Sequence, residues 1–88
     1  MTLTGRVFSG RKIIFAKSVS DELIKDANFH DRLETCLLGL CKEADIPAPM
    51  WLSKNSTELS RFGKTDFHSD QFPEKVGFDR FEIKIANR

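Results

Sequence analysis

Residues 28–44, NFHDRLETCLLGLCKEA, decide the fold of this chain. Their apolar side chains recur every three or four positions, which places them on one side of an α-helix. These side chains are Phe29, Leu33, Cys36, Leu37, Leu40, Cys41 and Ala44. Asn28 followed by Asp31 nearly matches the motif that caps a helix start. The helix is expected to end before Pro47, because a residue that precedes proline, here Ile46, is restricted to extended conformations.

A β-hairpin is predicted before this helix, over residues 2–19, because apolar and polar residues alternate on both sides of Ser9 and Gly10. We expect a three-residue loop at 8–10 with Gly10 in the left-handed conformation, since a shorter loop mixes apolar and charged residues on each face. In the expected register, the facing pairs are Leu3 with Phe15 and Gly5 with Ile13.

The rest of the chain predicts shorter elements. In chain order they are a short middle strand at 50–53, a brief helix at 57–62, an extended segment at 64–67, a loop at 69–77 and a strand at 78–86. Asn55 or Ser56 is expected to cap the brief helix and Gly63 to end it. Residues 18–27 fit either a loop with a short turn or a helical start.

Length and composition indicate one domain, residues 1–88, of a soluble globular protein. Apolar residues make up 40% of the chain and charged residues 31%. The pieces predict an α+β fold, in which an antiparallel sheet of about four strands packs against one main helix. The strands come from the N-terminal hairpin, a short middle strand and the C-terminal strand.

The net charge of +1 excludes a bulk field that attracts nucleic acid or acidic membrane. The charge is nevertheless uneven. Residues 1–20 carry +4, residues 21–49 carry −4 and the remainder carries +1. Solvated strand edges and a solvated helix face are enough to explain this distribution.

Cys36 and Cys41 are expected to be small apolar core side chains in a reducing compartment. Five helical residues turn by about 500°, so the two side chains point about 140° apart and are poorly placed for a disulfide. No apolar leader follows Met1, and no apolar run approaches the roughly 20 residues of a membrane span. We therefore expect a cytoplasmic protein without a membrane partner.

Basic, amide and aromatic side chains are densest between positions 51 and 68. The candidate ligand-binding residues are Trp51, Lys54, Asn55, Arg61, Lys64 and Thr65. Basic residues among aromatic ones suit a phosphate, a nucleotide or unpaired bases stacked on rings. The alternative is that Trp51, Phe62 and Phe67 belong to the core and that the basic residues are ordinary surface charges.

Catalysis finds little support in the sequence. Asp66, His68 and Asp70 would lie on one side of a strand and could ligate a metal, but a polar outer face has the same pattern. The sequence contains no phosphate-binding glycine loop, paired histidine motif, CxxC or nucleophile elbow. We expect no enzymatic activity and no cofactor.

Three motifs carry a resemblance to a known family. They are Trp51-Leu52-x-Lys54-Asn55, Arg61-Phe62-x-Lys64-Thr65-x-Phe67 and Phe78-Asp79-x-x-Glu82-Ile83. The chain resembles a family of small proteins of about ninety residues from Gram-positive anaerobic bacteria, and the resemblance covers nearly its whole length. Because that family has no assigned activity, the resemblance implies only a stand-alone cytoplasmic domain.

Two functional hypotheses follow. The first is a non-enzymatic binding domain whose Trp/Lys/Arg surface contacts an anionic molecule, RNA or a protein partner. The second is a structural homodimer, or a subunit of a larger assembly, that pairs through a sheet edge. Residues 3–7 and 81–85 are the expected edges.

Overall fold

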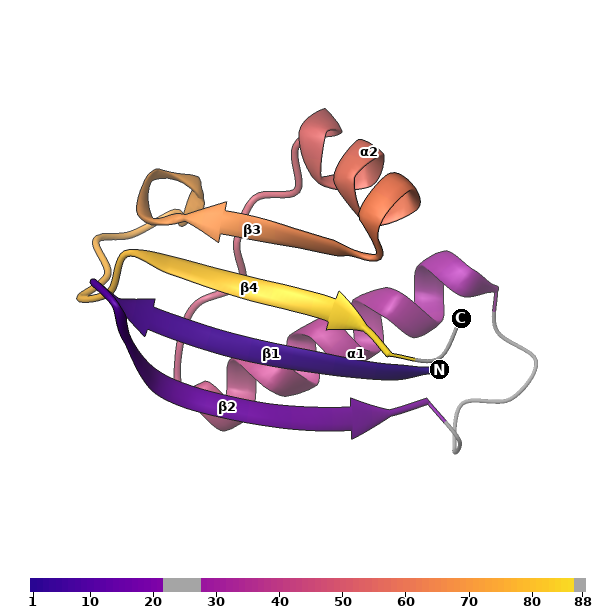
Figure 1. Ribbon diagram of the computed structural model, residues 1–88, viewed down its shortest axis with the longest axis horizontal. Helices are drawn as coiled ribbons and strands as arrows, with labels where there is room; N and C mark the ends of the chain where they lie inside the picture. Colours follow the sequence, from indigo (N-terminus) through magenta and orange to yellow (C-terminus); the bar gives the residue numbers. More distant parts are fainter. Residues whose placement is uncertain (22–27, 87–88) are drawn as a thin grey trace.

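A computed structural model describes residues 1–21 and 28–86, which form a four-stranded antiparallel sheet and a helical layer (Figure 1). The elements are β1 (Thr2–Ser9), β2 (Lys12–Ser20), α1 (Phe29–Ala44), α2 (Ser53–Phe62), β3 (Lys64–His68), the 3₁₀ turn η1 (Ser69–Gln71) and β4 (Arg80–Ile85). The strand order is β2-β1-β4-β3. The predicted α+β class is confirmed, and the brief helix predicted at 57–62 is part of a longer second helix, α2, beside the expected main helix.

The main helix forms where its sequence pattern predicts. The Asn28 side chain accepts a 2.8 Å hydrogen bond from the backbone N–H of Asp31, which satisfies one of the free amides of the first turn. At the other end Asp45 adopts a left-handed conformation, with φ at 57°, and its N–H donates to the carbonyl of Lys42. The helix therefore ends before Pro47, as expected.

The hairpin has the expected strands but not the expected register. Its turn consists of residues 10 and 11, and Ser9 lies opposite Lys12. Val7 faces Phe15 and Leu3 faces Val19, so the expected pairing of Leu3 with Phe15 is wrong.

A β-bulge explains the difference. The register shifts after Val7, which leaves Ile14 as an extra residue opposite β1. The extra residue lets Phe15 and Val19 share the inner face with their partners on β1, although the turn is shorter than expected. Gly10 has φ at +63°, and its N–H donates to the Asp79 carboxylate just before β4.

The middle of the chain departs further from the sequence prediction. No strand forms at 50–53, and α2 begins at Ser53 rather than at residue 57. The middle strand is β3, in the segment predicted to be extended. Asn55 accepts a 2.9 Å hydrogen bond from the backbone N–H of Leu52, which fixes this earlier start. Gly63 ends the helix as predicted, with φ at +71°.

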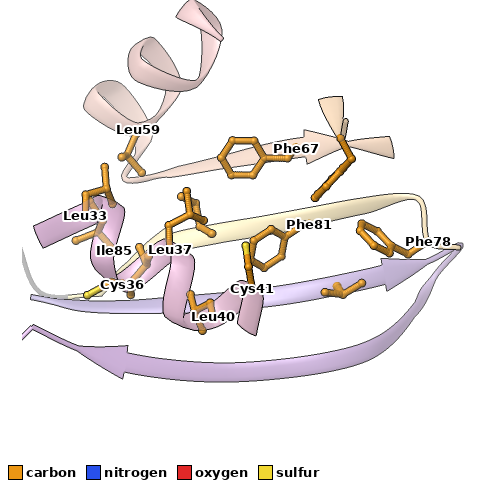
Figure 2. Close-up of a cluster of buried hydrophobic side chains, with 14 residues drawn as sticks. Leu33, Cys36, Leu37, Leu40, Cys41, Leu59, Phe67, Phe78, Phe81 and Ile85 are labelled. Carbon is orange, nitrogen blue, oxygen red and sulfur yellow. The ribbon is translucent and has the colours of Figure 1, made fainter. Parts of the chain in front are cut away.

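The core lies between α1, α2 and the inner face of the sheet (Figure 2). Its most deeply buried apolar members are Leu3, Val7, Leu40, Phe67, Phe81 and Ile83. Cys36 and Cys41 are buried and unpaired, as expected from their place on the helix. The alternation predicted for the C-terminal strand is also observed, since Phe81, Ile83 and Ile85 all face the core.

The sheet edges are not the expected ones. The strand order places β1 and β4 in the centre, each with a partner on both sides. Residues 3–7 and 81–85 therefore have no free edge, and the edges within the described part of the chain are β2 and β3. Neither described helix is long and apolar enough to cross a membrane.

Candidate functional site

The candidate residues do not gather on one surface. Asn55 and Thr65 are buried, whereas Lys54 and Arg61 lie on the exposed side of α2. Lys64 is exposed at the start of β3, and Trp51 lies in the segment that connects the two helices. The Trp/Lys/Arg surface expected from the sequence is thus divided among separate parts of the fold.

Asn55 is fully buried and uses its amide to join three elements. Its Oδ1 accepts from the N–H of Leu52 at 2.9 Å and from Nε2 of Gln71 at 3.1 Å. Its Nδ2 donates to Oγ1 of Thr65 at 2.8 Å and to the carbonyl of Asp66 at 3.1 Å. The amide is saturated by bonds within the protein.

Thr65 belongs to the same network. Its hydroxyl accepts from Asn55 and donates to Oε1 of Glu58 at 2.6 Å. Asn55 and Thr65 therefore hold α2 against β3, and their polar atoms are occupied within the fold.

An apolar groove lies between α1 and α2 and has a volume of about 710 Å³. Leu33 and Leu37 of α1 line it together with Leu59 of α2 and Ile85 of β4, and these four side chains are buried (Figure 2). The other residues that line it are Phe29, His30, Glu34, Leu38, Ala48, Pro49, Trp51, Ser56 and Ser60. The size falls within the range of roughly 300–1,000 Å³ that is typical of ligand sites.

Three large apolar side chains of the groove are exposed to an unusual degree. Phe29 is 49% exposed, Leu38 is 47% exposed and Trp51 is 38% exposed. Large apolar side chains that remain exposed around one groove are typical of interaction sites in soluble proteins.

Trp51 is held firmly in the wall of the groove. Its indole Nε1 donates to Oγ of Ser56 at 2.7 Å, and its ring packs at 5.6 Å from the buried ring of Phe67 with an interplanar angle of 56°. The indole can therefore contact a ligand with its remaining face without first being ordered, which lowers the entropic cost of binding.

Acidic groups stand where the groove meets the first turns of α1. His30 Nε2 is 3.6 Å from Glu34 Oε2, and one ligand atom from each of His30, Asp31 and Glu34 lies within 4.8 Å of the others. All three side chains are exposed. Such a cluster is common without a metal, so we assign it only a negative charge at this end of the groove.

Asp66, His68 and Asp70 are not among the metal-ligand clusters of residues 1–21 and 28–86. The Asp66 carboxylate instead pairs with Nη1 of Arg80 at 3.2 Å. The backbone N–H of His68 donates to Oε1 of Gln71 at 3.2 Å, at the start of the 3₁₀ turn that carries Asp70.

The outward-facing side chains of β3 and β4 carry charges that partly offset one another. Arg80 Nη1 lies 3.2 Å from Asp66 Oδ1 and 3.7 Å from Glu82 Oε2. Lys64 lies directly opposite Lys84. Two residues away along each strand, Asp66 lies opposite Glu82 on the same face. Because acidic residues lie among the basic ones, this face is poorly suited to binding a row of phosphate groups.

Leu38 and residues 48–49 line the groove although no sequence pattern predicted a site there, and Phe29, predicted to be a core side chain, is half exposed. One signal was present. Leu37 and Leu38 are adjacent, and two neighbouring helix residues point about 100° apart, so one of them had to leave the buried stripe.

The chain has no match among protein-family models, curated proteins or solved structures.

Proposed function

We propose that this chain is a non-enzymatic binding domain whose ligand places an apolar group in the groove between α1 and α2. The observation that carries the proposal is the clustering of exposed Phe29, Leu38 and Trp51 around a groove of about 710 Å³. The two free cysteines, Cys36 and Cys41, support a reducing location such as the cytoplasm.

The geometry favours an apolar ligand over an anionic one. Lys54, Arg61 and Lys64 lie outside the groove lining, which contains the carboxylate of Glu34 and neither lysine nor arginine. An anion placed against Trp51 would therefore meet a carboxylate rather than the basic residues that the sequence hypothesis requires.

The test uses N-phenyl-1-naphthylamine, a neutral apolar dye that accepts energy from tryptophan. Because Trp51 is the single tryptophan, binding in the groove should quench its emission and excite the dye. We expect saturable binding that weakens about tenfold in Leu38→Gln, since the substitution removes an apolar wall worth about 1.4 kcal/mol or more.

Phe62→Gln is the matched control. Phe62 is 65% exposed and lies on α2 outside the groove lining, so the same kind of substitution should leave dye binding unchanged. The proposal fails if the dye does not saturate, or if the two variants weaken binding equally.

A homodimer is the second candidate function, and the position of β2 at the edge of the described sheet favours it. Ile13 and Ile14 at the start of β2 are 47% and 53% exposed. If two β2 strands pair antiparallel about Ala16, Ile13 faces Val19 of the other copy and Phe15 faces Lys17, so no like charges meet.

Sedimentation at several protein concentrations tests the dimer. We expect concentration-dependent association that Ile13→Lys weakens, because the lysine would replace an apolar contact with Val19 of the other copy. A strict monomer at the highest concentration would eliminate this candidate and would leave the groove proposal untouched.

A further inference from the structure

We infer that the occupant of the groove is an amphipathic helix from a partner protein, with basic residues beside its apolar stripe. The inference rests on the proposed function and specifies the partner of the same site. The surface of α1, the length of the groove and the charge at its end each support it.

The surface of α1 along the groove has the form that helices use to pack together. Phe29, Leu33 and Leu37 form one row at four-residue spacing, and His30, Glu34 and Leu38 form a parallel row. Rows of this spacing are the ridges and grooves that receive the side chains of another helix. An extended peptide would need an unpaired strand edge, and the groove offers none among the described residues.

The length of the groove also fits a short helix. The lining residues of α1 span Phe29 to Leu38, which corresponds to about 13 Å at about 1.5 Å per residue. Three anchors at i, i+4 and i+7 of a partner helix cover about 10 Å, so two to three turns fill the groove. The segment at 48–49 and Trp51 form the opposite wall.

The charge at one end of the groove selects a basic partner. Asp31 and Glu34 stand in the first turns of α1, while Arg32, the nearest basic residue in sequence, is engaged with Asp21 at 3.4 Å. A partner with lysine or arginine beside its first or last anchor gains attraction here, whereas the same acidic helix of a second copy is repelled.

The experiment compares two capped synthetic peptides with the full chain. Both are 16-residue alanine-based helices with leucines at i, i+4, i+7 and i+11 and no aromatic residue. Four flanking positions carry lysine in one peptide and glutamate in the other. Trp51 emission reports binding, and calorimetry confirms the stoichiometry.

We expect the lysine peptide to bind at least about tenfold more tightly than the glutamate peptide at low salt. The difference should shrink as salt rises, because exposed charges are screened beyond roughly 10 Å at 0.1 M ionic strength. Glu34→Lys should reduce the preference to about threefold or less. Leu38→Gln should weaken both peptides.

Glu43→Lys is the matched control for charge. It lies on the same helix, is exposed, and changes the net charge by the same amount, but it is outside the groove lining. This variant should keep the preference for the lysine peptide. If Glu34→Lys and Glu43→Lys reduced the preference for the lysine peptide equally, the preference would reflect only the net charge of the protein, and the inference would be overturned.

The remaining outcomes separate the inference from the proposed function. If the two peptides bind equally, or if N-phenyl-1-naphthylamine binds and neither peptide does, the inference of a basic helical partner is overturned. The proposal of an apolar binding groove is then unaffected. Self-association that Leu38→Gln abolishes would assign the groove to a second copy and overturn the inference. Failure of both peptides and the dye overturns the inference and the proposed function together.

Discussion

At the scale of single residues, burial rather than residue type decides which polar side chains can meet a ligand. Asn55 looks like a surface recognition residue in the sequence because it stands between Lys54 and Ser56. In the fold it points inward and bonds to Leu52, Thr65, Asp66 and Gln71. A buried amide with four partners contributes to stability because its own donors and acceptors are all satisfied and it joins three elements of the fold.

Replacing Asn55 should therefore destabilise the fold strongly. We expect Asn55→Ala to lower the free energy of unfolding by about 3 kcal/mol, since it removes four hydrogen bonds, three of which join α2 to β3 and η1. Urea titrations that follow Trp51 emission measure the change. Lys54→Ala, an exposed neighbour, should stay within about 0.5 kcal/mol of the parent. A loss below about 1 kcal/mol in Asn55→Ala would contradict the structural role.

Two glycines offer a second test, with opposite signs. A Cβ on Gly5 would lie 2.9 Å from Cε1 of Phe81 and 3.0 Å from Cδ1 of Leu40, so Gly5→Ala should cost about 1–3 kcal/mol by overpacking. A Cβ on Gly39, within α1, meets nothing within 4 Å. Gly39→Ala should therefore stabilise the protein by about 0.5–1 kcal/mol. Thermal unfolding of both variants measures the two changes in stability. If Gly5→Ala and Gly39→Ala changed the stability equally, the close contact of α1 with β1 at Gly5 would be refuted.

At the scale of elements, end contacts determine how strands and helices meet. Asp21 follows β2, and its carboxylate accepts a 2.9 Å hydrogen bond from the Met1 ammonium beside β1. The same carboxylate lies 3.4 Å from Nη1 of Arg32 on α1. One side chain thus joins both hairpin strands to the main helix.

This arrangement predicts a pH dependence of stability. The hydrogen bond from the Met1 ammonium, aided by the positive charges of the ammonium and Arg32, holds the pKa of Asp21 below its usual value of 3.8 despite the opposing effect of burial. The stabilisation is present above the unfolded-state pKa and is lost as the pH falls through the lower, folded-state pKa.

Asp21→Asn should remove this part of the pH dependence. In urea titrations between about pH 2 and pH 6, the parent should lose more stability on acidification than the variant, and the two curves should converge at the acid end. Parallel curves would contradict the contribution of Asp21. Asp70→Asn, at an exposed carboxyl on η1, is the control and should keep the parent's acid dependence.

The sequence predicts elements well where a single periodicity and local caps agree. The main helix, its Asn28 cap, its end before Pro47 and the C-terminal strand all follow from local patterns. The hairpin register fails because a bulge at Ile14 allows a pairing that bulge-free registers exclude. Residues 50–53 are apolar without being a strand, since apolar content alone does not distinguish a strand from a helix start. Residues 22–27, part of the ambiguous stretch, lie outside the described residues.

At the scale of the whole molecule, the candidate site depends on contacts that local patterns cannot reveal. The groove exists because α1 and α2 lie on the same side of the sheet and the segment between them carries Trp51 across the gap. The sequence identifies Trp51 as a candidate but assigns it basic neighbours. Those neighbours, Lys54 and Arg61, point away because α2 begins at Ser53 and turns them toward solvent.

The single-domain organisation predicted from the length makes a last prediction about cooperativity. Cys36 and Cys41 report on the contact of α1 with the sheet, and Trp51 reports on the segment that leads to α2. If residues 1–88 unfold in one step, thiol labelling, tryptophan emission and helical circular dichroism should share one urea midpoint.

The two thiols should remain unlabelled at urea concentrations below that midpoint. Burial raises the pKa of the Cys36 thiol and raises that of Cys41 to about 11, so the reactive thiolate is scarce at pH 8 in the folded chain. A disulfide reagent should therefore label the native protein at least about a hundredfold more slowly than the unfolded protein. Because both thiols are buried side chains of α1, labelling below the tryptophan midpoint would mean that this helix separates from its neighbours before the rest of the core opens. The groove would then be lost before the fold, since α1 forms one of its walls.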